Sequence, residues 1–210
     1  MLKPIRWKTF PLDFLRIQIG FALYGISIVL MIKSNLGTGA WAVLDVALSK
    51  IIGLSVGRMT MLSGFVVLMI ALTMREKIGW GTLGNMIFIG LWLDFFNPFI
   101  PNVDGNLLVQ SAMLLGAVLI MGNASAIYIG VDAGAGPRDS LMLALHRVTG
   151  VSVRVARTSI ELTVILVGWL LGGPAGIGTA IFALLIGPAV QWGFKLWKVE
   201  PHKSEEESPL

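Results

Sequence analysis

Long apolar stretches separated by short polar breaks fill this chain of 210 residues. A helix needs about 20 apolar residues to cross the hydrocarbon of a bilayer, within a range of roughly 17–25. Six stretches reach that length, and each predicts a membrane-spanning helix: 12–32, 57–74, 81–100, 107–129, 153–171 and 176–197. Two more apolar stretches, 40–52 and 137–149, are too short to span. Each follows a glycine-rich turn and ends at a glycine, which predicts a short helix with a C-terminal cap.

The two halves of the chain resemble each other. A shift of 97 residues aligns 25–97 with 122–194 without a gap, and sixteen of the 73 aligned pairs are identical. Each half then holds three spans, and an odd number turns the second copy upside down in the membrane. The predicted fold class is an all-α integral membrane protein of six transmembrane helices. They form two inverted three-helix repeats, each with a short helix after a glycine-rich turn.

The composition agrees with a membrane protein and excludes a soluble one. Apolar residues make up 55% of the chain and charged residues 13%, about half the charged share of an average soluble domain. No polar segment is long enough for a separate catalytic or nucleotide-binding domain. No stretch alternates basic and aromatic residues, which excludes a nucleic-acid partner. The chain has no cysteine and two histidines, so we expect no metal site and no cofactor.

The basic residues indicate the orientation. With the N-terminus in the cytoplasm and six crossings, 13 of the 16 basic residues lie on the cytoplasmic side, all except Lys33, Lys50 and Arg58, as the positive-inside rule requires. We therefore expect a multi-pass plasma-membrane protein with both termini inside. Its expected domains are a cytoplasmic N-terminus (1–11), a first repeat (12–100), an external loop (101–106), a second repeat (107–197) and a disordered acidic cytoplasmic tail (198–210).

Several motifs resemble a known family. In the second half they are Gly134-Ala-Gly-Pro-Arg-Asp139 with Leu141-Met142, Arg157-x-x-x-Glu161, Gly172-Gly-Pro-Ala-Gly-Ile-Gly-Thr179 and Gly187-Pro188. In the first half they are Leu36-Gly-Thr-Gly-Ala-Trp41 and Gly79-Trp-Gly-Thr-Leu-Gly-Asn85. Together they are similar to the YczE branch of the YczE/YyaS/YitT membrane proteins, over nearly the whole chain outside its termini. The resemblance implies a bacterial multi-pass membrane protein and assigns no activity to it.

Ionisable residues inside apolar stretches are the first candidates for function, because each costs free energy there unless it is paired or hydrated. Arg157 and Glu161 lie four residues apart and share one helical face, so they can pair. The pair is either structural or part of a solute or proton site. Its counterparts in the first repeat, Thr60 and Gly64, are uncharged, and a purely structural pair would more naturally be kept in both halves.

The second candidate is the glycine turn before each short helix. The segment 134–139 predicts an unwound loop leading into a helix, with Pro137 at its first position. Asp139 can cap this helix or complement its exposed amides. Inside the membrane such a helix end offers amide groups to an anion, reinforced by Arg138. The alternative is an ordinary loop before a surface helix. The candidate substrate-binding residues are Gly134, Gly136, Arg138, Asp139, Arg157, Glu161, Gly37, Gly39 and Asn85.

These features favour a small secondary transporter or solute-binding membrane protein with an anionic solute. The first alternative is a partner-dependent membrane subunit, for substrate capture or assembly, and the glycines also suit a homo-oligomer. An intramembrane enzyme is less favoured, because the chain holds no nucleophile with a nearby base and no metal cluster. We expect no catalytic residue. Asp45 and Asp94 are two more intramembrane charges, and Trp41 is assigned to the membrane interface without a ligand role.

The orientation is tested by cysteine labelling on the naturally cysteine-free chain. In intact cells Asn102→Cys should react with a membrane-impermeant maleimide, because the positive-inside rule places its loop outside. Glu205→Cys should react only with a permeant reagent. Labelling of Glu205→Cys by the impermeant reagent would contradict the cytoplasmic C-terminus.

Overall fold

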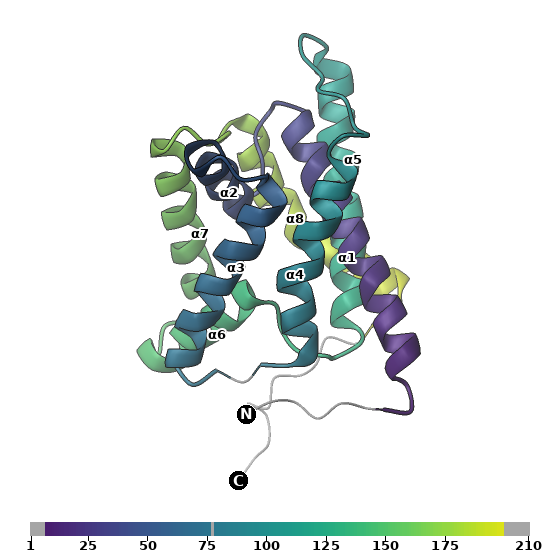
Figure 1. Ribbon diagram of the computed structural model, residues 1–210, viewed down its shortest axis with the longest axis vertical. Coiled ribbons are helices and arrows are strands. Elements are labelled where there is room, and N and C mark those ends of the chain that lie inside the picture. The colour runs from purple at the N-terminus through teal and green to yellow at the C-terminus, as the bar shows by residue number, and fades with distance from the viewer. Residues whose placement is uncertain (1–6, 77, 200–210) are drawn as a thin grey trace.

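The computed structural model describes residues 7–76 and 78–199. Its regular elements are all α-helices (Figure 1): α1 (Phe10–Lys33), α2 (Ala40–Ile52), α3 (Val56–Thr73), α4 (Trp80–Phe96), α5 (Leu107–Ile129), α6 (Pro137–Thr149), α7 (Val153–Leu170) and α8 (Ile177–Leu196). All eight predicted helical segments coincide with one of these helices. The largest difference is at α4, which ends four residues early because Pro98 has no amide hydrogen with which to continue the helix. Most of the predicted acidic tail, 200–210, lies outside the described residues, as do residues 1–6.

Four helices are long and apolar enough to cross a membrane: α1, α3, α5 and α8. Of the other two predicted spans, α4 has 17 residues and α7 carries Arg154, Arg157 and Glu161. Large apolar side chains cover the outer faces of the bundle; Leu184 on α8, for example, is 76% exposed. A helix that is apolar on its outer face as well suits lipid and not water. The chain is therefore an all-helical membrane protein.

The 97-residue offset of the sequence recurs in the helix bounds. The short helices α2 and α6 have 13 residues each, and α3 and α7 have 18 each, at that offset. Both short helices end at a glycine in the left-handed region, Gly53 with φ +79° and Gly150 with φ +73°. These are the predicted C-terminal caps, which glycine adopts without steric cost. Equivalent local sequences thus fold alike in the two halves.

The glycine turn of the first half packs on the start of α8 in the second half. A Cβ atom built on Gly37 would lie 2.7 Å from Oγ1 of Thr179 and 2.8 Å from the amide nitrogen of Gly176. The amide of Gly178 donates a hydrogen bond of 2.7 Å to the carbonyl of Leu36. Gly37 also has a φ of +118°, so both its backbone conformation and its neighbours require glycine.

The glycine turn of the second half makes the same contacts with the start of α4. A Cβ atom built on Gly134 would lie 2.8 Å from Oγ1 of Thr82 and 2.8 Å from the amide nitrogen of Gly79. The amide of Gly81 donates a hydrogen bond of 3.0 Å to the carbonyl of Ala133. Each of these contacts lies 97 residues from its counterpart in the other half. The two halves are therefore joined by a reciprocal pair of glycine contacts, which we call the crossed turns.

The two halves differ in how their last two long helices pack. In the first half, α3 and α4 cross at Gly57 and Gly90, where a side chain on either residue would overlap the backbone of the other. Asp94 of α4 caps the start of α3: it accepts hydrogen bonds from Oγ of Ser55 at 2.5 Å and from the amide of Gly57 at 2.9 Å. Asp94 is thus a structural cap that joins two helices.

In the second half these contacts are lost. Arg154 stands where the first half has Gly57, and Gln191 stands where it has Asp94. The helices α7 and α8, which are described along their whole length, make at most marginal contact with each other. A Cβ atom built on Gly187, the equivalent of Gly90, meets nothing within 4 Å. The bundle is therefore closed between α3 and α4 and open between α7 and α8.

This difference predicts opposite effects of one substitution at equivalent positions. Gly90→Ala should destabilise the protein by about 1–3 kcal/mol, the usual cost of overpacking a tight contact. Gly187→Ala is the matched control, and it should leave stability unchanged or raise it, because alanine favours a helix more than glycine does. Thermal unfolding of the two purified variants in detergent measures the difference. Equal effects would contradict the asymmetric packing.

Candidate functional site

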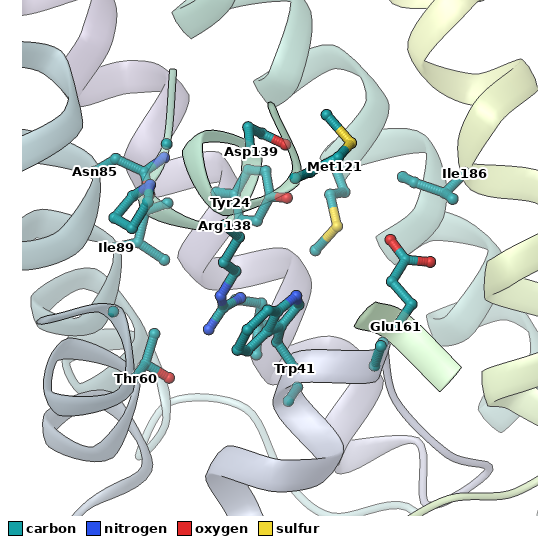
Figure 2. A pocket seen from close by; sticks show the side chains of 18 of the residues that line it. Tyr24, Trp41, Thr60, Asn85, Ile89, Met121, Arg138, Asp139, Glu161 and Ile186 are labelled. Atoms are coloured by element: carbon teal, nitrogen blue, oxygen red, sulfur yellow. The ribbon is translucent and has the colours of Figure 1, made fainter. Parts of the chain in front are cut away.

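A cavity lies between the two halves, and all eight helices contribute to its lining (Figure 2). The empty space among its lining residues, counted out into open solvent, is about 1080 Å³. The lining consists of Tyr24, Ile28, Met31, Gly39, Ala40, Trp41, Ala42, Thr60, Gly64, Asn85, Met86, Ile89, Met121, Tyr128, Gly136, Pro137, Arg138, Asp139, Met142, Arg157, Ile160, Glu161, Phe182 and Ile186.

The lining follows the internal repeat. Twenty of its 24 residues form ten pairs at the 97-residue offset, so both halves present equivalent positions to the same space. All four charged residues of the lining belong to the second half. They are Arg138, Asp139, Arg157 and Glu161, and their first-half equivalents are Trp41, Ala42, Thr60 and Gly64. The lining positions are therefore symmetric between the two halves, whereas the charges at these positions are not.

Seven of the nine predicted site residues line this cavity: Gly39, Asn85, Gly136, Arg138, Asp139, Arg157 and Glu161. Gly37 and Gly134 are outside the lining, because they form the crossed turns behind it. The amide side chain of Asn85 lies against Gly136, and the ring of Phe182, its repeat equivalent, lies against Gly39. The glycines at the start of both short helices are thus covered from the opposite half.

Both short helices direct their N-terminal ends toward the cavity. In Figure 1 α2 lies at the upper end of the bundle and α6 at the lower end, so they approach the cavity from opposite sides. Ala40 and Pro137, their first residues, both line it. The capping residues, Gly39 and Gly136, provide no side chain to bond the first amides. The positive ends of two helix dipoles therefore meet in one cavity.

Arg138 joins the two halves electrostatically. Its Nη2 atom donates to Oδ2 of Asp45 at 2.9 Å, and its guanidinium carbon lies 4.9 Å from the ring centroid of Trp41, within cation–π range. Oγ1 of Thr60 donates to the same oxygen of Asp45 at 2.9 Å. Asp45 is 1% exposed, and its Oδ1 atom has no hydrogen-bond partner within the described residues. Arg138 is thus the charge that compensates a buried carboxylate.

Two residues make contacts that the sequence did not predict. Trp41 was expected at the membrane interface, but it lies in the cavity beside Arg138 (Figure 2). Asp139 was expected to cap α6, yet the capping position is occupied by Gly136 and the helix has no side-chain cap. Asp139 instead accepts a hydrogen bond of 3.2 Å from the hydroxyl of Tyr128, whose ring packs edge-on against Tyr24. The third residue of the helix points into the cavity and not back at the helix end.

The predicted pair of Arg157 and Glu161 is present, with 2.9 Å between Nε and Oε1. The two side chains are 54% and 34% exposed, whereas their first-half equivalents, Thr60 and Gly64, are buried. The difference follows from helix packing, because α4 covers α3 while α8 leaves α7 uncovered. The pair thus lies at the mouth of the cavity.

Sequence reasoning missed Trp41 and Asp45 as parts of this site, along with Tyr24 and Tyr128. The repeat alignment contained a signal for the first of them, because Trp41 is the equivalent of Arg138 and so occupies the same place at a short helix. The contact between Asp45 and Arg138 joins residues 93 positions apart. No local pattern could reveal it.

Known proteins support the membrane assignment. A family model described as "Family of unknown function (DUF6198)" matches residues 13–195. "Uncharacterized membrane protein YczE" of Bacillus subtilis (strain 168) is 36% identical over 78% of this chain and 76% of its own. An "Uncharacterized protein" of Haemophilus influenzae is 32% identical over 86% and 83%, and "Uncharacterized protein YyaS" of Bacillus subtilis is 30% identical over 80% and 86%. No solved structure matches the chain.

The buried ion pair predicts a large effect of a small substitution. Asp45→Asn keeps the shape of the side chain and leaves Arg138 without its counter-charge, so it should destabilise the protein by on the order of 3 kcal/mol. Glu76→Gln is the control: it breaks the ion pair with Arg147, whose side chain is 47% exposed, and should change stability by at most about 1 kcal/mol. Thermal unfolding in detergent compares them. Equal stability of the two variants would show that the buried pair contributes nothing.

Proposed function

This chain belongs to the DUF6198 family of membrane proteins, and on that premise we propose that it is a small transporter that binds an anionic solute in its central cavity. The observation that carries the proposal is the meeting of two helix N-termini and two arginines in one cavity. Helix N-termini at the ends of broken helices are a common way to hold anionic groups inside a membrane.

The proposal includes the topology. Six helices cross, namely α1, α3, α4, α5, α7 and α8, while α2 and α6 enter the membrane from opposite faces and turn back. The 17 residues of α4 reach about 25 Å, near the lower limit for a span. Arg157 and Glu161 of α7 are tolerated because they line the cavity as an ion pair. The two repeats are inverted, with both termini in the cytoplasm. The shared 97-residue offset of helices and contacts supports this arrangement.

The arginines have the capacity to bind an anion. A guanidinium group carries five N–H donors, whereas the ion pair of Arg138 engages Nη2 and that of Arg157 engages Nε. Asp45 and Glu161 neutralise these groups, which lowers the cost of placing charges at membrane depth. An arriving anion would share or replace these carboxylates as the partner of the arginines. Binding would therefore depend on both members of each pair.

We propose a carrier and not an enzyme. The lining carboxylates are engaged, Asp139 by the hydroxyl of Tyr128 and Glu161 by Arg157. Neither contact provides an activated nucleophile of the kind that hydrolysis or group transfer requires. The chain has no phosphate-binding loop of the Walker type, so transport would be driven by an ion gradient or by a partner protein.

The proposal predicts that the charged pair at the mouth is needed for binding but not for folding. In the double variant Arg157→Met with Glu161→Leu, apolar side chains of similar size replace both charges, so stability should be kept or should rise. Binding of anions, measured as a thermal shift across a panel of inorganic and organic anions, should be lost. Uptake of the bound anion into proteoliposomes should be lost with it.

The matched control removes the same charges outside the cavity. Glu76→Gln with Arg147→Gln breaks an ion pair that is 3.2 Å long at the end of α6, and it should leave anion binding intact. A double variant at Arg157 and Glu161 that still binds anions would limit that pair to a structural role. A wild-type protein that binds no anion, soluble or lipid, would refute the proposed function.

A further inference from the structure

The cavity is more exposed on one side than on the other. On the α3 and α4 side its lining residues Thr60, Gly64 and Ile89 are buried, because these helices pack closely at Gly57 and Gly90. On the α7 and α8 side the helices leave each other uncovered, and Arg157 is the one exposed residue of the whole lining. The mouth therefore lies between two neighbouring helices and opens sideways from the bundle.

A sideways mouth at membrane depth faces lipid and not water. The residues at the gap are the repeat equivalents of those that join α3 to α4, and they are polar or small. Arg154, Thr158 and Gln191 stand where the first half has Gly57, Met61 and Asp94, and Gly187 stands where it has Gly90. Arginine and glutamate side chains exposed to hydrocarbon cost several kcal/mol unless something polar meets them. The gap thus requires a polar occupant, although its surroundings are apolar.

The charge of the gap argues against a second copy of the chain as that occupant. Arg154 and Arg157 against Glu161 give the α7 side a surplus of one positive charge. A two-fold interface would place the same patch of both copies face to face, which brings these arginines together. An anionic group is the complementary occupant.

We propose that the solute is an anionic phospholipid whose headgroup enters the cavity between α7 and α8 while its acyl chains stay in the bilayer. This rests on the proposed function and adds the substrate class and the route. The headgroup meets Arg157 at the mouth and the starts of α2 and α6 inside. The acyl chains lie along the outer surface, where Leu162 and Leu184 are 62% and 76% exposed.

The test is native mass spectrometry of the full-length protein in detergent, titrated with phosphatidylglycerol, with zwitterionic phosphatidylcholine and with glycerol phosphate as the soluble headgroup. Gly187→Leu places a side chain in the gap, where a Cβ atom meets nothing within 4 Å, so the variant should fold. Gly116→Leu is the matched control, because it has the same free space on α5 outside the cavity. Phosphatidylglycerol should bind the wild type, and Gly187→Leu should weaken it by at least about tenfold, which is 1.4 kcal/mol. Gly116→Leu should bind it unchanged.

Four results would overturn the inference. If glycerol phosphate binds as tightly as phosphatidylglycerol and Gly187→Leu has no effect, the cavity binds an anion but not through the gap, so the proposed function stands alone. If phosphatidylcholine binds as well as phosphatidylglycerol in all variants, the lipid is held on the outer surface. If the protein is a dimer that Gly187→Leu dissociates and no lipid binds, the gap is an interface between copies. Binding of none of these anions would count against both proposals.

Discussion

The arrangement of this protein depends on the crossed turns, in which each glycine turn lies against the helix start of the other half. The left-handed Gly37 and Gly134 bring the chain so close to α8 and α4 that no side chain fits between them. One amide-to-carbonyl hydrogen bond in each turn fixes the approach. Because each short helix begins three residues after its turn glycine, these contacts also determine where α2 and α6 start. The close contacts of the crossed turns, in which the side chains of Thr82 and Thr179 take part, thus hold the two helix N-termini at the cavity.

The two repeats have equivalent helices but pack them differently, and a few residues account for the difference. Gly57 and Asp94 join α3 to α4, and with Arg154 and Gln191 in their places α7 and α8 cannot come together in the same way. A guanidinium side chain is too large for a crossing that tolerates only hydrogen at Cα. The first half therefore closes the bundle, whereas the second half supplies its charged groups and its opening.

Much of the fold could be predicted from the sequence, because its determinants are local. Apolar length, glycine caps and the repeat identify α2 and α6 at their observed bounds, 40–52 and 137–149. The pair of Arg157 and Glu161 could also be predicted, since a four-residue spacing on a helix is a local relation. The partner of Arg138 could not, because Asp45 reaches it only through the crossed turns. The contact of Asp139 was missed for a different reason. A cap was inferred from residue type, whereas the helix begins directly after Gly136, which occupies the capping position.

The divergence of the repeats also limits what can bind in the cavity. The symmetry mate of the contact between Arg138 and Asp45 would join Trp41 to Met142, so the ionic contact has an apolar counterpart. Two identical copies would have desolvated two ion pairs in one small space, and each such pair costs several kcal/mol of desolvation before its attraction is counted. Replacing one pair with an indole and a thioether keeps the volume filled and halves that cost. The result is a cavity with one charged wall and one largely apolar wall. Under the proposed function, an anionic group in this cavity would therefore be held from the charged wall only.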